Sequence, residues 1–180
     1  MSEFIKQTNL DDLFSINRKT NGDFRGFFRE VAHLDEIEDE VGNPIKFVQI
    51  NHSRSVPGVI RGLHAENWNK LVYPVNGEMI SVLVDIRPDS KNFGKFDILS
   101  FSDTDRKALF IPKGFANSIC VTGDTPVDYV YLVDAYYTGE DTRAIDLNSL
   151  GIKWPVKNPI ISPRDKNNPT LQQMFPDKFK

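Results

Sequence analysis

The feature of this sequence that most constrains its fold is the division of its apolar residues into short runs. Each run is rich in aromatic or β-branched residues, among them many of the chain's 13 phenylalanines and five tyrosines, and is interrupted by Gly, Pro, Asn or Asp. Residues of the first kind favour strands, and the interrupting residues favour turns. The pattern therefore predicts an all-β domain.

The runs predict a set of strands and one helix. The expected strands are Phe47–His52, Val59–His64, Lys70–Val75, Glu78–Ile86, Phe96–Ser102, Ala108–Ile111, Ser118–Val121 and Asp128–Tyr136. Between two of them lies the dipeptide Asn76-Gly77, which predicts a tight hairpin because both residues tolerate positive φ. A short helix is expected around Leu34–Glu40, outside the sheets.

Length and strand spacing predict how the chain is organised. Residues 1–180 are expected to form one domain, because this length is usual for a domain and 39% of the residues are hydrophobic. Antiparallel strands at this spacing favour a jelly-roll β-barrel or sandwich with a few short peripheral helices, although periodicity does not separate it from other β-sandwiches. Asn158–Lys180 is rich in Pro, Asn, Asp and Lys, so we expect an irregular tail over the barrel.

Charge and cysteine content exclude several classes of partner. With 25 acidic and 22 basic residues the net charge is −3, which disfavours nucleic acid as a partner. The one cysteine, Cys120, cannot form an internal disulfide or a thiolate-rich metal site, which suits a reducing cytoplasm. No export signal begins the sequence, and no stretch approaches the roughly 20 apolar residues that span a bilayer, so we expect no membrane association.

Two segments resemble the metal-binding motifs of cupins, which commonly read His-x-His followed by Glu and, later, Pro-x-Gly-x-x-His. Here residues 58–66 read Gly-Val-Ile-Arg-Gly-Leu-His-Ala-Glu and residues 112–117 read Pro-Lys-Gly-Phe-Ala-Asn, so His64 is the one histidine left. Stable Zn²⁺ or Fe²⁺ binding usually takes three protein ligands. We therefore expect neither a metal nor another cofactor.

A longer series of motifs resembles the dTDP-4-dehydrorhamnose 3,5-epimerase family, in the same order and at similar spacing, from about residue 24 to residue 165. The matching stretches are residues 25–30 (Arg-Gly-Phe-Phe-Arg-Glu), 48–53 (Val-Gln-Ile-Asn-His-Ser), 61–64 (Arg-Gly-Leu-His), 70–72 (Lys-Leu-Val), 84–87 (Val-Asp-Ile-Arg), 110–116 (Phe-Ile-Pro-Lys-Gly-Phe-Ala) and 161–165 (Ile-Ser-Pro-Arg-Asp). The resemblance implies an enzyme that inverts C3, C5 or both in a nucleotide-activated 4-keto-6-deoxy sugar.

The resemblance also implies four catalytic residues. His64 matches the base, and an imidazole suits proton abstraction near neutral pH. Asp165 matches the carboxylate that orients the base, which requires the tail to fold back to His64. Lys70 matches the cation that faces the enolate oxygen. Tyr131 matches the acid on the opposite face, although alternation places Tyr129 beside it and leaves an aromatic core stripe as the other interpretation.

Further positions match residues that bind the nucleotide or the sugar in the family. They are Arg25, Phe28, Glu30, Gln49, Asn51, Arg61, Asn117 and Tyr137. Arginine binds pyrophosphate through paired hydrogen bonds, which suits an acidic protein that needs a local anion site. Strict alternation would point Arg61 and His64 to opposite faces of their strand, so we expect a bulge at Gly62.

The chain departs from the family in three places, and several alternatives remain open. The family usually reads His-Tyr-Gln and then a longer loop where residues 64–70 are compact, Asn117 replaces a second histidine, and the acidic residue expected after Tyr137 aligns near Thr142, close to Glu140 and Asp141. The nucleotide base and the sugar are therefore not fixed. A single-centre epimerase, a 3,4-ketoisomerase and a non-catalytic sugar-nucleotide-binding cupin are the alternatives, and the resemblance implies a homodimer.

Overall fold

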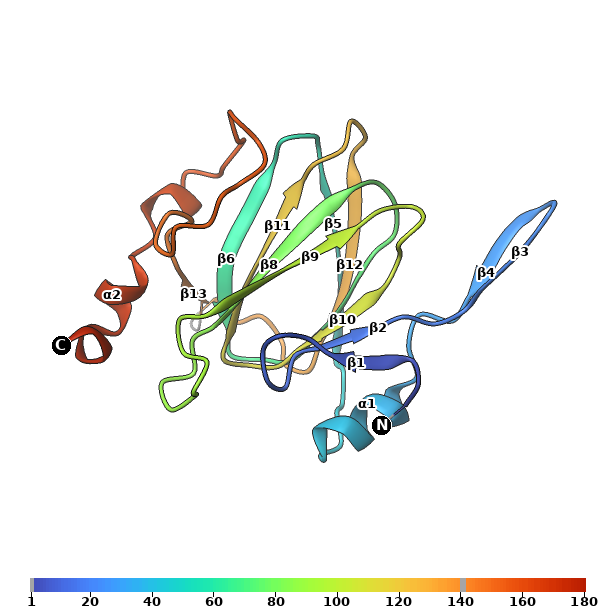
Figure 1. Cartoon of the computed structure of the whole chain (residues 1–180), viewed down its shortest axis with the longest axis horizontal. Coiled ribbons are helices and arrows are strands. Elements are labelled where there is room, and N and C mark those ends of the chain that lie inside the picture. The colour runs from blue at the N-terminus through green and yellow to red at the C-terminus, as the bar shows by residue number, and fades with distance from the viewer. Residues whose placement is uncertain (1, 140–141) are drawn as a thin grey trace.

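Two antiparallel β-sheets face each other in the computed structural model, which describes residues 2–139 and 142–180 (Figure 1). Within those residues, one sheet has the order β1 (Ile5–Gln7), β2 (Phe14–Ile16), β10 (Ala108–Ile111), β7 (Lys70–Pro74), β12 (Val127–Val133) and β5 (Gln49–Ser55). The other has the order β13 (Thr142–Ala144), β6 (Ile60–Glu66), β11 (Phe115–Val121), β8 (Met79–Asp85) and β9 (Phe96–Phe101). The prediction of an all-β sandwich is confirmed.

Three apolar clusters hold the sandwich together. The first lies between the sheets and includes Val72, Leu83 and Leu109. The second covers the outer face of the β6–β11–β8 sheet with residues from the C-terminal part of the chain, among them Leu171. The third covers the β1–β2–β10 end of the other sheet, where Ile37 of the helix α1 (Leu34–Val41) is buried. Burial of these faces is the main stabilising contribution to the fold.

A two-stranded hairpin projects away from the sandwich (Figure 1). It consists of β3 (Thr20–Asp23) and β4 (Gly26–Arg29), paired antiparallel, and nearly all of its residues are exposed. Sequence patterning missed this hairpin and the three-residue strands β1, β2 and β13. Strands so short carry no alternation, and the hairpin has no buried face to generate one.

The expected hairpin at Asn76-Gly77 is wrong. Gly77 has the positive φ that the dipeptide predicted, at 74°, but β7 pairs with β10 and β12 whereas β8 pairs with β9 and β11. The dipeptide therefore turns the chain from one sheet to the other. The Asn76 side chain accepts a hydrogen bond from the Asp128 backbone N–H at 2.8 Å, which ties this corner to β12.

The helix expected around Leu34–Glu40 is present as α1, which ends at Gly42 in the left-handed conformation. The tail, expected to be irregular, contains three short helical turns: η1 (Asp165–Asn167), α2 (Leu171–Met174) and η2 (Pro176–Phe179). Thr170 and Gln173 form a capping box at α2, a four-residue signal that sequence reading missed. Among the described residues, no helix is long and apolar enough to cross a membrane.

Candidate active site

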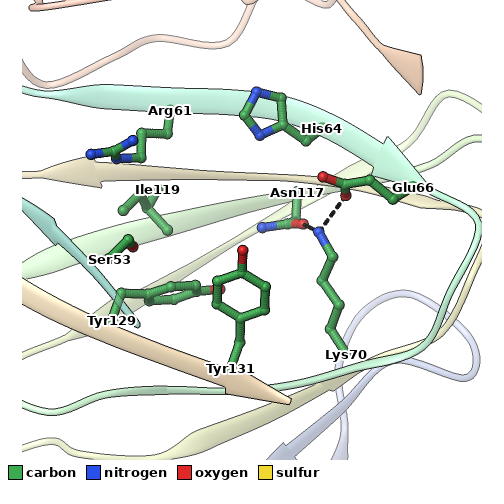
Figure 2. A pocket seen from close by; sticks show the side chains of 9 residues that line it. All are labelled: Ser53, Arg61, His64, Glu66, Lys70, Asn117, Ile119, Tyr129 and Tyr131. Atoms are coloured by element: carbon green, nitrogen blue, oxygen red, sulfur yellow. Dashed lines mark hydrogen bonds and ion pairs between the residues drawn. The ribbon is translucent and has the colours of Figure 1, made fainter. Parts of the chain in front are cut away.

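A cavity of about 140 Å³ lies between the two sheets (Figure 2). Side chains from both sheets line it: Ser53, Arg61, His64, Glu66, Lys70, Asn117, Ile119, Tyr129 and Tyr131. Five of these residues, His64, Lys70, Tyr131, Arg61 and Asn117, are positions that the sequence analysis selected. The sandwich therefore brings together side chains from four strands that lie up to 70 positions apart in the sequence. Periodicity alone could not predict that they meet.

His64 and Asp165 form the hydrogen-bonded pair that the sequence analysis expected. The His64 Nε2 atom lies 2.8 Å from Asp165 Oδ1, with the imidazole 26% exposed and the carboxylate 4% exposed. Asp165 belongs to η1 in the tail, where its backbone N–H donates to the Ser162 hydroxyl at 3.1 Å. Because Nε2 is held by the carboxylate, Nδ1 is the ring nitrogen on the cavity side (Figure 2).

A bulge on β6 aims His64 into the cavity. Asn117 pairs with His64 and Ile119 pairs with Arg61, so three residues of β6 span the distance that two residues of β11 span. Gly62 lies in this bulge with a φ of 131°, and a Cβ atom there would lie 2.6 Å from Ser118 Cβ. The expected bulge at Gly62 is confirmed, and it lets Arg61 and His64 line the same cavity.

Lys70 enters the cavity from the start of β7 and is almost fully buried. Its Nζ atom donates to Glu66 Oε2 at 2.5 Å and to Asn117 Oδ1 at 2.8 Å (Figure 2). The three groups form one end of the cavity. Asn117 pairs directly with His64 across β11 and β6.

Tyr131 lies on the wall opposite His64. It comes from β12 in one sheet and His64 comes from β6 in the other, and the Tyr131 hydroxyl points into the space between them (Figure 2). Tyr129 lines the same cavity, but its hydroxyl is buried and has no hydrogen-bond partner among the described residues. The geometry therefore separates the two tyrosines that alternation could not.

The cavity shifts three pKa values in ways that follow from burial and charge. Burial lowers the pKa of the Lys70 ammonium, and the Glu66 carboxylate opposes this shift. Burial acts to raise the pKa of Glu66, but the charges of Lys70 and His64 outweigh it, so that pKa lies below its usual value. Burial, and then the charge of Glu66, raise the pKa of the Tyr131 phenol, which therefore stays protonated across the neutral range.

Gln49, Asn51 and Tyr137 lie beside the cavity and do not line it. Asn51 pairs with Tyr131 across β5 and β12, and its side-chain oxygen accepts from Gln49 Nε2 at 2.6 Å. The Tyr137 backbone N–H donates to Gln49 Oε1 at 3.3 Å. Because residues 49, 51 and 53 share one face of β5 and Ser53 lines the cavity, Gln49 and Asn51 continue that face toward the end at which Lys70 lies, since Gln49 and Lys70 both pair with Val133.

Arg25, Phe28 and Glu30 lie apart from the cavity. Arg25 and Phe28 belong to the projecting hairpin, where the Arg25 side chain pairs with Asp23 and Phe28 is 68% exposed. Glu30 follows the hairpin and pairs with Arg18 at 3.2 Å and with His33 at 3.3 Å. No contact within the described part of this chain brings these three residues to His64.

Sequence reasoning missed four residues that line the cavity: Ser53, Glu66, Ile119 and Tyr129. All four lie two residues from a selected position on the same strand. Glu66 follows His64 by two residues on the same strand, and Ser53 follows Asn51 by two, so alternation places each on the face of a residue already selected. Alternation likewise places Ile119 on the face of Asn117 and Tyr129 on the face of Tyr131. Both were passed over because isoleucine and tyrosine side chains in a strand ordinarily belong to the core.

The loop between β6 and β7 is short, because β6 runs to Glu66 and β7 begins at Lys70. Asn69 anchors it: its backbone N–H and side chain donate to Asp134 at 2.9 and 2.7 Å, and its Oδ1 accepts from the Lys113 backbone N–H at 3.0 Å.

Glu140 and Asp141, considered for recognition of the nucleotide base, lie outside the described residues. Among those described, no group of three His, Cys, Asp or Glu is arranged to hold a metal ion.

Comparison with known proteins gives a consistent result. The family model described as dTDP-4-dehydrorhamnose 3,5-epimerase matches residues 7–173. Enzymes of that name from Shigella flexneri and Escherichia coli are 40% and 37% identical to this chain, covering 91% and 95% of it and 93% and 96% of themselves. The crystal structure of a dTDP-6-deoxy-D-glucose-3,5-epimerase from Legionella pneumophila, in complex with dTDP-4-keto-L-rhamnose, is 35% identical, superimposes with a TM-score of 0.88, and matches over 96% of this chain and 95% of its own. With the motifs, the sandwich and the similarity all extending over nearly its whole length, the chain belongs to the dTDP-4-dehydrorhamnose 3,5-epimerase family of isomerases.

Proposed function

We propose that this enzyme inverts C3 and C5 of a dTDP-linked 4-keto-6-deoxy sugar through enolate intermediates, with His64 as base and Tyr131 as acid. The observation that carries the proposal is the placement of an imidazole and a phenol on opposite walls of one cavity, each from a different sheet. Inversion requires a proton to leave one face of a carbon and another to arrive at the opposite face. A sugar ring between these two walls meets both requirements.

His64 removes the proton. Its Nδ1 atom on the cavity side takes the proton from the carbon beside the C4 ketone, while Asp165 holds Nε2–H and stabilises the imidazolium that forms. The 4% exposure of Asp165 favours this role because little water competes for the carboxylate.

Lys70 stabilises the charge that develops on the C4 oxygen. An ammonium fixed in place before the reaction stabilises an enolate without reorganisation, which is an effective way to lower such a barrier. Lys70 is held by two hydrogen bonds to side chains of the cavity wall, so its position does not depend on the substrate. The Tyr131 phenol then returns a proton to carbon from the opposite face.

Substrate binding is assigned to the other positions of the family pattern. Arg61 and Asn117 line the cavity, and Gln49, Asn51 and Tyr137 lie at its margin, so these five side chains bind the sugar and the adjoining diphosphate. Arg25, Phe28 and Glu30 would bind the nucleotide from a second subunit, as argued below. The thymidine base is proposed from the similarity to epimerases of dTDP-linked sugars.

Deuterium exchange tests the reaction. The protein is incubated in D₂O with dTDP-4-keto-6-deoxyglucose, and ¹H NMR follows loss of the C3 and C5 protons together with formation of the inverted sugar. Exchange with inversion at both carbons supports the proposal. Exchange at one carbon identifies a single-centre epimerase, conversion to a 3-keto sugar identifies a ketoisomerase, and binding without exchange identifies a non-catalytic protein. The UDP- and GDP-linked sugars are the controls for base preference.

The hairpin supports a homodimer. Phe24 is 98% exposed and Phe27 and Phe28 are each 68% exposed, on an arm that extends away from the sandwich (Figure 1). Three phenylalanines exposed together are costly in water, and such patches mark interaction sites. We therefore propose that the hairpin of one subunit packs against the other and delivers Arg25 and Phe28 to its cavity.

Mixing two inactive variants tests this exchange. A mixed dimer combines one His64→Asn subunit with one Arg25→Ala subunit. If the hairpin acts across the interface, the cavity of the Arg25→Ala subunit keeps its own His64 and receives Arg25 from the other subunit, so one site is intact. Unfolding and refolding the two together should then restore activity above the sum of the separate variants. No restoration in verified mixed dimers would show that each hairpin serves its own subunit.

We also propose that residues 1–180 act as one domain located in the cytoplasm. Packing of the tail residue Leu171 in the same cluster as β6 and β8 supports a single domain. The buried, unpaired Cys120 supports a reducing compartment.

A further inference from the structure

Glu66 is the charged residue of the cavity lining to which no role has yet been given. It lies two residues after His64 on β6, so both side chains point into the cavity. Its Oε2 atom accepts from Lys70 Nζ at 2.5 Å, and the two side chains are 14% and 9% exposed. Figure 2 shows this ion pair, with Asn117 as the second acceptor, at the end of the cavity away from Arg61.

We propose that Glu66 is a positioning residue for the epimerisation: it holds Lys70 at the cavity wall as an ammonium ion, ready to face the enolate oxygen. The proposal rests on the role given above to Lys70. It concerns a residue at which this chain, reading His-Ala-Glu at residues 64–66, departs from the His-Tyr-Gln motif that it resembles.

Burial is what makes the carboxylate effective at this place in this chain. An amine removed from water loses its proton more readily, so a lysine this buried stays charged only if an anion lies close to it. Among the described residues, Glu66 is the carboxylate in contact with Lys70 Nζ, whereas Asp165 is engaged by His64 and by the Gly62 backbone N–H at 3.4 Å.

The other groups that face Lys70 do not replace Glu66. From β6, His64 and Arg61 are neutral or positive; from β11, Asn117 is neutral; and from β12, Tyr129 and Tyr131 present phenols that remain protonated because burial raises the pKa of both. The ring of Tyr131 lies 5.9 Å from Lys70 Nζ, which adds a weak attraction for the cation. Removing the charge of Glu66 therefore leaves the ammonium without an opposing charge in contact.

Glu66→Gln tests directly whether Glu66 keeps the Lys70 ammonium protonated. Protein labelled with ¹³C-lysine is titrated by NMR, and the Lys70 signal is assigned by its absence in Lys70→Met. The Lys70 pKa should fall by about 1–3 units in Glu66→Gln, the effect expected for loss of an opposite charge at contact distance. Glu66→Asp, which keeps the charge but moves it by one methylene, should give a smaller fall. Glu78→Gln, which removes an exposed carboxylate on the corner between the sheets, should leave the Lys70 signal unmoved.

Activity measurements separate this inference from the proposed function. The alkaline limb of the kcat/KM profile should move to lower pH in Glu66→Gln by the same number of pH units as the Lys70 pKa falls. At pH values below the alkaline limbs of both wild type and variant, kcat/KM should stay within about threefold of wild type. An unshifted Lys70 titration in folded Glu66→Gln and Glu66→Asp would overturn the inference. If the Lys70 pKa shifts but the pH profile of kcat/KM does not, or if Lys70→Met is fully active, then Glu66 still keeps Lys70 protonated. Those results would instead overturn the role proposed for Lys70.

Discussion

Two histidine–aspartate pairs in the described part of this chain have almost the same geometry and very different surroundings. His64 and Asp165 are 2.8 Å apart with 26% and 4% of their side chains exposed, and His52 and Asp128 are 2.9 Å apart with 60% and 16% exposed. The first pair lies in the cavity between the sheets. The second lies on the outer face of β5 and β12, because residues 50, 52 and 54 point away from the face that carries Ser53.

The difference is the reason that we propose only one of the two pairs as a catalytic base. Asp128 also accepts a hydrogen bond from Arg54 at 3.3 Å, so its charge is shared with a cation and with water. Asp165 is bonded to His64 and to a backbone N–H, with little water around it. Electrostatic interactions are stronger in such an enclosed setting. Enclosure, a facing phenol and a nearby ammonium distinguish the cavity pair.

Exchanging each histidine for asparagine is the strongest way to test this contrast. His64→Asn should lower kcat/KM by about 10³-fold, since the base that begins the reaction is lost. His52→Asn should change kcat/KM by less than about twofold, because the surface pair faces no cavity. Initial rates of epimerisation, with circular dichroism to verify folding, measure both. Comparable losses in the two variants would mean that the enclosing cavity is not what sets His64 apart.

Tyr131→Phe sharpens the contrast by removing the facing acid and leaving the base. Inversion should slow by about 10²-fold, because proton delivery from the wall opposite His64 is lost. Exchange of the substrate proton with D₂O should continue, since His64 and Asp165 still abstract it. NMR resolves exchange from inversion in one experiment. Equal loss of both processes would show that Tyr131 takes part in abstraction rather than in reprotonation.

Gly62→Ala tests whether the bulge on β6 is what directs His64 into the cavity. His52 lies on β5, which pairs with β12 in regular register and has no such bulge. A Cβ at position 62 would lie 2.6 Å from Ser118, so the free energy of unfolding should fall by about 2–4 kcal/mol and activity should fall with it. Gly58→Ala is the matched control: its φ is 80°, but a Cβ there meets nothing within 4 Å. That variant should lose only about 1 kcal/mol. Urea unfolding measures both.

Tyr129→Phe should have the smallest effect. Its hydroxyl is buried without a partner among the described residues, so removing it should leave activity within about twofold and raise the free energy of unfolding by up to about 1 kcal/mol. Thermal unfolding with and without substrate tests this. If substrate protects wild type but not Tyr129→Phe, the hydroxyl binds substrate and belongs with Tyr131.

Sequence patterning predicted the principal strands well because they are short runs of aromatic and β-branched residues bounded by turn residues, whether they alternate, as β9 does, or are buried throughout, as β10 is. β10 was expected at its observed bounds, and the early start of β11 at Phe115 was missed because residues 112–117 were read as a motif instead of a strand. β12 ends at Val133 rather than Tyr136, since Asp134 turns inward to bind Asn69. Such an end is set by a partner 65 residues away, which no local window contains.

For the site, the sequence by itself determined the reactive groups and their order along the chain. Resemblance of short motifs selected His64, Lys70, Tyr131 and Asp165, and a glycine at position 62 indicated the bulge. Tertiary structure alone decided that Glu66 faces Lys70, that Tyr131 rather than Tyr129 presents its hydroxyl to the cavity, and that Arg25 and Phe28 lie on a projecting arm. Those facts depend on distances between strands of different sheets, and the packing of the two sheets fixes these distances. Residue types fix only the chemistry that each side chain can perform in the position where the fold places it.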